Sequence, residues 1–217
     1  MIKIGIGQAY LIRYDKRQYI KLIHHQLIFI QKMNVPGLSI QKDIITPETE
    51  TAIIDWLDKR EWSNALSRRT QHYGYEYQYQ TTELKSGPPF EGVIADIAKF
   101  LIDQKIMDRV DQCIVNEYYR DQGIGKHIDG KRGTKPNIFG PVIVSISLGE
   151  DTNIIFSRGN QKEEIFVPRR CLLVMTGDSR YEWTHEIPRW MSVNTGSKNI
   201  KKSENYRRIS LTFRSLA

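Results

Sequence analysis

The sequence predicts an α+β protein whose β part is a sandwich or barrel, with the helices placed before the strands. Apolar residues recur at helical spacing in the first half of the chain, whereas after about Asp111 they fall in short β-rich segments separated by turn residues. No Pro/Gly/Ser-rich linker and no internal repeat divides the 217 residues. Helices followed by many short strands are typical of a helical layer packed on a β-sandwich or barrel.

The predicted helices lie before Asp111. Residues 18–33 look helical, and we interpret residues 1–45 as a partly helical N-terminal extension before a main domain of residues 46–217. Thr46 and Pro47 supply an N-cap and a first-turn proline for a helix that ends near Arg60. A further helix is expected after residues 87–89, on a buried face formed by Ile94, Ile97, Ala98, Leu101 and Ile102.

The predicted strands follow Asp111. They combine β-branched and aromatic residues with turn residues between them. They span residues 113–118, 141–148, 153–157, 163–167, 171–176, 181–185 and 207–213.

Composition and charge exclude several classes of protein. Two cysteines cannot form the framework of a disulfide-stapled secreted domain, and the longest apolar stretch near the N-terminus, residues 22–30, is interrupted by polar residues. We therefore expect an intracellular protein, cytoplasmic or nuclear, with no membrane partner. From Glu186 to the C-terminus the chain has seven basic and two acidic residues, which suits a polyanion such as nucleic acid. A solvated loop explains Lys198 to Lys202 equally well.

Three candidate metal ligands stand at the ends of predicted strands. His127 and Asp129 are two positions apart, so in an extended segment their side chains point the same way, and the fold would have to bring in His185. Two imidazoles and one carboxylate leave three positions open on an octahedral metal, as in non-haem Fe(II) oxygenases. Zinc bound by the same three side chains, as in a hydrolase, is an alternative.

The last predicted strand has a polar and an apolar face. Alternation places Arg208, Ser210, Thr212 and Arg214 on one face and Ile209, Leu211 and Phe213 on the other. Two inward-facing guanidiniums are costly unless an anion meets them, and a small dicarboxylate would satisfy both. Asn116 and Tyr118 have the right spacing to add hydrogen bonds to the same ligand. The alternative is an edge strand whose arginines reach solvent.

Together these segments resemble the AlkB family of Fe(II)- and 2-oxoglutarate-dependent dioxygenases. The resemblance covers about residues 67–217, and its motifs are closest to the branch that hydroxylates wobble uridine in tRNA. The motifs are Asn116-Glu-Tyr118, Gly123-Ile-Gly125, His127-Ile-Asp129, Ser145-Ile-Ser-Leu-Gly149, residues 168–177, Asp178-Ser-Arg-Tyr-Glu-Trp-Thr-His185 and Arg208-Ile-Ser-Leu-Thr-Phe-Arg214.

The resemblance implies a double-stranded β-helix, or jelly roll, with Fe(II) held by His127, Asp129 and His185. It implies that Arg208 clamps the distal carboxylate of 2-oxoglutarate, that Arg214, Asn116 and Tyr118 contact its other end, and that Ser210 and Thr212 contribute weaker contacts. O2 is the third reactant, and the products are succinate, CO2 and an oxidised substrate. The resemblance thus implies that the polar residues of these two strands bind one ligand, 2-oxoglutarate.

The resemblance also implies a nucleobase substrate in RNA or single-stranded DNA. A nucleotide-recognition lid is expected near residues 67–80, where Arg69, Tyr73 and Tyr75 would contact the substrate, with Lys131 as a further contact. Oxidative demethylation or hydroxylation of nucleobases in nucleic acid, as in AlkB-like alkylation repair, is the leading interpretation. tRNA wobble-uridine hydroxylation, protein demethylation and a catalytically silent nucleic-acid-binding jelly roll are the alternatives. The sequence does not predict an oligomeric state.

Overall fold

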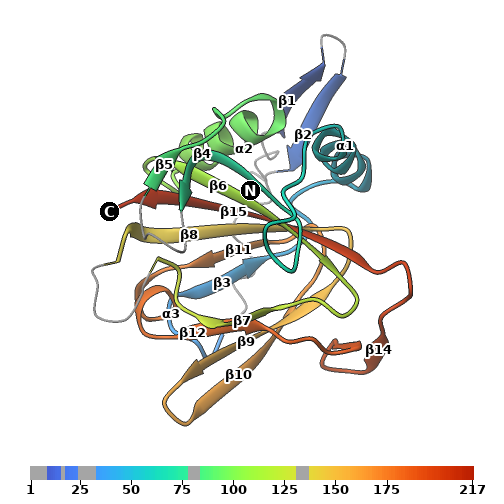
Figure 1. Cartoon of the computed structure of the whole chain (residues 1–217), viewed down its shortest axis with the longest axis vertical. Coiled ribbons are helices and arrows are strands. Elements are labelled where there is room, and N and C mark those ends of the chain that lie inside the picture. The colour runs from blue at the N-terminus through green and yellow to red at the C-terminus, as the bar shows by residue number, and fades with distance from the viewer. Residues whose placement is uncertain (1–8, 16–17, 24–32, 78–83, 131–136) are drawn as a thin grey trace, which may run out of the picture.

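The computed structural model describes residues 9–15, 18–23, 33–77, 84–130 and 137–217 (Figure 1). Two facing antiparallel sheets form the centre of the molecule, as expected for a jelly roll. The larger sheet has seven strands in the order β3-β11-β8-β15-β6-β4-β5, and the smaller has four in the order β10-β9-β12-β7. Ile143 of the larger sheet and Phe156 of the smaller one belong to one buried cluster, which fills part of the space between the sheets.

Six of the seven predicted strands are observed with bounds within three residues of the prediction, and the two sheets contain further strands. The larger sheet consists of β3 (Leu38–Gln41), β4 (Thr70–Tyr77), β5 (Leu84–Ser86), β6 (Gln112–Tyr119), β8 (Phe139–Leu148), β11 (Leu172–Met175) and β15 (Arg207–Leu216). The smaller sheet consists of β7 (Ile124–His127), β9 (Thr152–Arg158), β10 (Gln161–Val167) and β12 (Thr184–Ile187). A separate hairpin pairs β13 (Ser192–Asn194) with β14 (Asn199–Lys201).

Two helices cover the outer face of the larger sheet. Helix α1 (Pro47–Asp58) begins where predicted, because the Thr46 side chain accepts a hydrogen bond from the Thr49 amide at 3.2 Å, and α2 spans Gly92–Asp103. Residues of both helices and the apolar row of β15 form one buried cluster, which includes Ile53, Leu57, Ile97, Leu211 and Phe213. The polar row of β15 therefore faces the smaller sheet.

Two sequence predictions about secondary structure are wrong. The helix predicted over residues 18–33 is a strand, β2 (Gln18–Ile23), which pairs with β1 (Ala9–Asp15); residues 24–32 lie outside the described residues. The β-favouring residues Tyr19, Ile20 and Ile23 pair with residues of β1, and that pairing outweighs the helical spacing. The strand predicted from Tyr181 begins at Thr184, because a capped short helix, α3 (Gly177–Tyr181), precedes it.

Strand β3 lies within residues 1–45 but pairs with β11, so the larger sheet begins before residue 46. The lid predicted near residues 67–80 overlaps β4, whose residues Thr70–Gly74 pair with β6; residues 78–80 lie outside the described part of the chain. None of the described helices has the length and apolar character needed to cross a membrane.

Candidate active site

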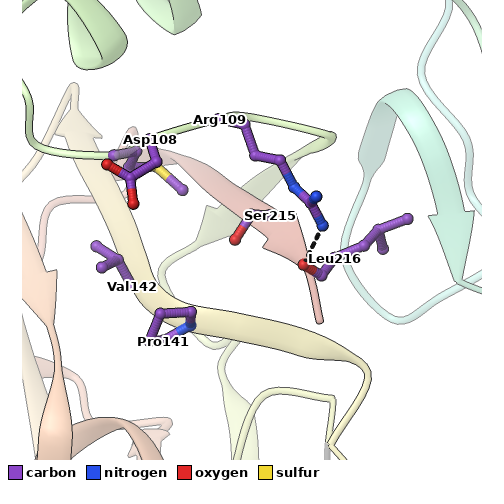
Figure 2. A pocket seen from close by; sticks show the side chains of 7 residues that line it. Asp108, Arg109, Pro141, Val142, Ser215 and Leu216 are labelled. Carbon is purple, nitrogen blue, oxygen red and sulfur yellow. Dashed lines mark hydrogen bonds between the residues drawn. The ribbon is translucent and has the colours of Figure 1, made fainter.

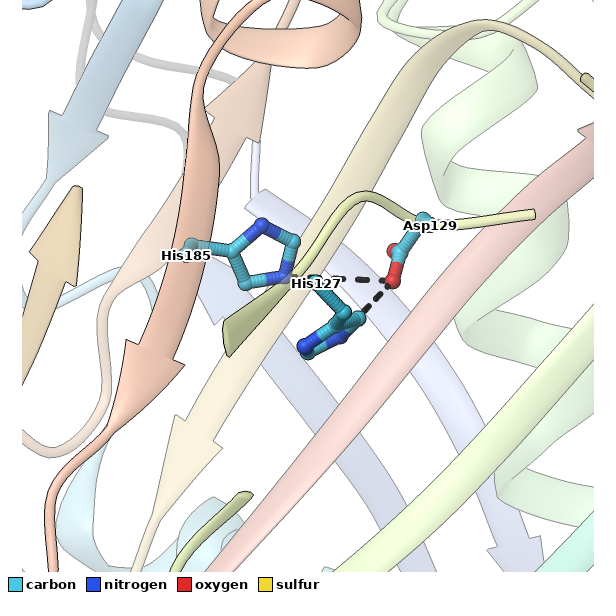
Figure 3. Close-up of side chains that lie close together, drawn as sticks. All are labelled: His127, Asp129 and His185. Carbon is cyan, nitrogen blue, oxygen red and sulfur yellow. Dashed lines mark ion pairs between the residues drawn. The ribbon is translucent and has the colours of Figure 1, made fainter. Parts of the chain in front are cut away.

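The three predicted metal ligands meet between the two sheets. His127 ends β7, His185 lies opposite it on β12, and Asp129 follows in the turn after β7. Oδ1 of Asp129 lies 3.3 Å from Nε2 of His127 and 3.8 Å from Nε2 of His185. One ligand atom from each residue lies within 4.8 Å of the other two, and Figure 3 shows both rings beside the carboxylate. The arrangement suits one metal ion bound by all three.

The protonation of His185 and Asp129 favours binding of a cation. Nδ1 of His127 donates to the Gly125 carbonyl oxygen over 2.8 Å, so Nε2 is the nitrogen that faces Asp129. Burial lowers the pKa of His185 to about 4, so its ring is neutral near pH 7. Burial alone would raise the pKa of Asp129, but the neighbouring Arg214 guanidinium holds it well below its usual range. The Asp129 carboxylate and the neutral His185 ring are thus ready to donate electron pairs to a metal ion.

Arg214 fixes the orientation of the Asp129 carboxylate. Its Nε and Nη2 each lie 3.2 Å from Oδ2 of Asp129, and its Nη1 donates to Oε1 of Gln112 over 2.9 Å. Oδ2 is therefore occupied by the guanidinium, and Oδ1 is the oxygen left facing the histidines. Gln112 precedes Asn116 by four positions on the same strand face, so the alternation used for Asn116 and Tyr118 would have identified it.

Arg180 is a site residue that the sequence analysis missed. Its side chain is 1% exposed and donates from Nη1 to the Asp129 carbonyl oxygen over 2.9 Å, from Nε to Gly140 and from Nη2 to Phe139 and Asn137. It belongs to α3, five residues before His185. One arginine thus ties the turn that carries Asp129 to the segment that leads into His185.

Replacing Arg180 by methionine is expected to weaken metal binding about tenfold or more, because it releases the backbone of Asp129. Mn(II) titration of the purified protein measures this, with Ile53→Ala in the outer core as a control for destabilisation. Equal metal affinity in Arg180→Met and wild type, or an equal loss in both variants, would assign Arg180 a purely structural role.

The polar row of β15 forms a second part of the site. In the register of the sheet, Arg208 pairs with Tyr118 and Ser210 with Asn116, so these side chains share the inner face. The Ser145 hydroxyl lies 3.0 Å from the hydroxyls of both Ser210 and Thr212. All six residues predicted to bind the dicarboxylate therefore lie on the inner face of β6 and β15.

Arg208 is a buried guanidinium with a donor available for an anion. It is 2% exposed, and its Nε donates to the Ser147 hydroxyl over 3.0 Å, while its buried Nη1 has no hydrogen-bond partner among the described residues. No carboxylate of the described residues forms an ion pair with it. A buried guanidinium with an unused donor is costly unless a ligand supplies an acceptor. The carboxylate of a dicarboxylic acid is an acceptor of the required charge and geometry.

Arg208 and Arg68 flank the Tyr118 ring, at 5.5 and 5.8 Å from its centroid. Arg68 also donates from Nε to Oδ1 of Asn116 over 2.7 Å. Asn116 and Tyr118 are thus held beside the guanidiniums on the inner face.

The residues predicted to contact the substrate do not form one cluster among the described residues. Tyr73 is 4% exposed in the outer core and its ring lies 6.1 Å from that of Trp56, so it is not brought to the metal centre. Arg69 is occupied by Glu117, to which Nη2 donates over 2.8 Å. Tyr75 is 41% exposed on β4. Lys131 lies outside the described residues.

A recess beside the start of β8 and the end of β15 contributes no residue to this site. Figure 2 shows it beside the C-terminal strand, where Nη2 of Arg109 donates to the Leu216 carbonyl oxygen over 2.6 Å. Its lining contains none of the predicted site residues. The lining residues are Met107, Asp108, Arg109, Pro141, Val142, Ser215 and Leu216.

Fold and site together define a jelly-roll oxygenase with a two-histidine, one-carboxylate metal centre. A sequence profile described as the 2OG-Fe(II) oxygenase superfamily matches residues 42–214, and the chain belongs to this superfamily. Enzymes of this superfamily use Fe(II), 2-oxoglutarate and O2, and the donor set of His127, Asp129 and His185 fits the iron. The chain is thus an oxidoreductase, which excludes the zinc hydrolase alternative.

Its relatives place the chain among AlkB-like proteins. It is 35% identical, over 70% of its length, to the Macaca fascicularis protein named tRNA (carboxymethyluridine(34)-5-O)-methyltransferase ALKBH8, of which it spans only 24%. It is 32% identical to the uncharacterized protein L905 of Acanthamoeba polyphaga mimivirus, over 84% of this chain and 86% of that protein. The solved structure of OsALKBH1 shares the fold, with a TM-score of 0.61 and 18% identity over 85% of this chain and 99% of that one.

Proposed function

We propose that the chain hydroxylates or oxidatively demethylates a nucleobase in nucleic acid. The observation that carries the chemistry is the buried Nη1 of Arg208, which has no partner among the described residues and lies in the region between the two sheets, here called the chamber, together with the His-Asp-His triad. His127, Asp129 and His185 would hold iron, Arg208 the distal carboxylate of 2-oxoglutarate, and Asn116, Tyr118, Ser210 and Thr212 the rest of the cosubstrate. Arg214 would orient Asp129 and contact the cosubstrate.

When bound, iron would supply the oxidative decarboxylation of 2-oxoglutarate by O2, which yields succinate and CO2 and inserts the second oxygen atom of O2 into a C–H bond of the substrate. The protein's own residues position the reacting carbon and exclude water from the space between the sheets. If that carbon is an N-methyl group, the hydroxymethyl product loses formaldehyde and the base is restored. If it is a carbon-bound methylene, the hydroxyl group remains.

The names of several relatives support a nucleic-acid substrate. The Macaca protein is named for uridine 34 of tRNA, an Arabidopsis thaliana relative for repair of alkylated DNA, and a Caenorhabditis elegans relative for demethylation of N6-methyladenine in DNA. We favour tRNA as the first substrate to test, because the identity to the tRNA-directed relative is 35%, compared with 28% and 24% for the other two.

The test is mass spectrometry of nucleosides after incubation with tRNA, and separately with methylated RNA and DNA oligonucleotides, in the presence of Fe(II), ascorbate and 2-oxoglutarate. We expect the wild type to convert one modified nucleoside and to form more succinate as it does so. Asp129→Ala should convert no nucleoside and form no additional succinate. Binding should also weaken steeply as salt increases, because phosphate contacts release counterions. Unchanged nucleosides together with succinate formation stimulated by a methylated protein would replace this proposal with protein demethylation.

A further inference from the structure

We propose that the β13–β14 hairpin and the residues leading into it form an RNA-binding surface, here called the hairpin surface. The inference rests on the proposed function and adds a place where the substrate strand is held outside the chamber. Large apolar side chains are exposed there: Trp190 is 39% exposed, Met191 42% and Ile200 43%. Exposed basic side chains alternate with them. The hairpin surface consists of Arg189, Trp190, Met191, Lys198, Ile200 and Lys201.

The charge of this surface is of one sign. Residues 188–203 contain four basic residues and no acidic residue, and of the four only Lys202 is buried. No ion pair engages Arg189, Lys198 or Lys201 among the described residues, whereas the exposed Arg158 and Lys99 both have carboxylate partners. Unpaired cations beside an exposed indole provide phosphate contacts and a stacking surface together, which is the combination that single-stranded nucleic acid requires.

The hairpin is anchored firmly to the jelly roll. Asn153 of β9 donates to the Asn194 carbonyl oxygen and accepts from the Asn194 amide, both over 2.8 Å. Val193 is 5% exposed, so the face of the hairpin that it shares with its cross-strand partner Ile200 is partly packed, and Lys201 lies on the opposite face. The exposed side chains are thus presented on a fixed support, which reduces the entropy lost when a strand binds.

The hairpin surface begins beside the strands that carry the metal ligands. A Cβ atom at Gly123, directly before β7, would lie 3.2 Å from Cγ of Arg189 and 2.2 Å from the Ile187 carbonyl oxygen, so Arg189 packs closely on the start of that strand. The hairpin also connects β12, which carries His185, to β15, which carries Arg208 (Figure 1). A nucleic-acid strand held here would lie at the edge of the smaller sheet, next to β7 and β12.

The experiment is a fluorescence anisotropy titration of labelled tRNA at several salt concentrations. Lys198→Gln/Lys201→Gln and Trp190→Ala are each expected to weaken binding about tenfold. The lysine double variant should also reduce the slope of log affinity against log salt by about 1.4, the value for two lost single-strand phosphate contacts. Lys99→Gln/Lys162→Gln, which removes the same charge from α2 and β10, should bind as the wild type does.

The possible failures are distinguishable. If the wild type binds tRNA with a steep salt response and the hairpin variants match it in affinity and slope, the hairpin surface is wrong while the proposed function stands. If the wild type binds neither tRNA nor single-stranded DNA, the proposed function fails and this inference fails with it. If the variants lose affinity for DNA but not for tRNA, the assignment to RNA is wrong. Substrate-independent turnover of 2-oxoglutarate should be equal in all variants, because none of the changed residues lies in the chamber.

Discussion

Asp129→Ala should abolish 2-oxoglutarate turnover and reduce metal affinity by at least about 100-fold, since loss of a residue that only hydrogen-bonds to a metal ligand already costs about 10- to 100-fold. The carboxylate is the group common to the whole centre, because Oδ1 faces both histidines and Oδ2 binds Arg214. Its removal also leaves the guanidinium of Arg214 without its carboxylate. Mn(II) titration and succinate formation measure the two losses.

Thermal unfolding separates loss of the metal centre from loss of the fold. Breaking a buried ion pair by removing one partner costs roughly 3–5 kcal/mol, so the free energy of unfolding of the apo protein should fall. Asp129→Asn keeps the shape of the side chain and should lose metal binding with less destabilisation. Asp178→Asn, an exposed carboxylate paired with Arg158 at 2.9 Å, is the matched control and should leave turnover intact. Turnover that survives in both Asp129 variants would remove this residue from the metal centre.

Local patterns in the sequence predicted most of the site because strand alternation determines which face a side chain occupies. The alternation in residues 208–214 placed Ile209, Leu211 and Phe213 under the helices, and all three are fully buried there. The polar row then had to face the opposite sheet. The two-residue spacing of His127 and Asp129 likewise placed both on one side, even though Asp129 lies in the turn just after the strand.

Residues whose partners are remote in the sequence could not be assigned in this way. Arg69 was expected to hold the substrate, but it shares Glu117 with Arg207, and Arg207 in turn pairs with Asp58 at the end of α1. Arg180 could not be assigned, because three of its four acceptors are backbone carbonyl oxygens, which no side-chain motif marks, and the fourth is the Asn137 side chain, 43 positions away. Tyr73 and Tyr75 are two positions apart, and the sequence did not show which part of β4 the helices would cover. It therefore could not predict that Tyr73 would be buried while Tyr75 stays exposed.

Arg208→Met is expected to affect the cosubstrate and the metal very differently. Loss of one partner of a buried, hydrogen-bonded charge pair costs at least about 2 kcal/mol, or roughly 30-fold in the Kd of 2-oxoglutarate. Metal affinity should change less than about threefold, because Arg208 has no contact with His127, Asp129 or His185. Arg208→Lys keeps the charge but loses the paired donors, so its affinity for 2-oxoglutarate should lie between those of the wild type and Arg208→Met. Titrations with 2-oxoglutarate and with Mn(II) measure each effect separately.

The same substitution should stabilise the apo protein, unlike the loss of Asp129. Arg208 is buried without a carboxylate partner among the described residues, so an apolar side chain of similar length removes an uncompensated charge. We expect the apo Tm to rise, and the further rise that 2-oxoglutarate produces in the wild type to disappear. Arg207→Met is the control at the neighbouring position: it breaks the pairs with Glu117 and Asp58, lowers Tm and leaves 2-oxoglutarate affinity unchanged. Equal 2-oxoglutarate affinity in both variants would show that the unpaired guanidinium of Arg208 does not hold the cosubstrate.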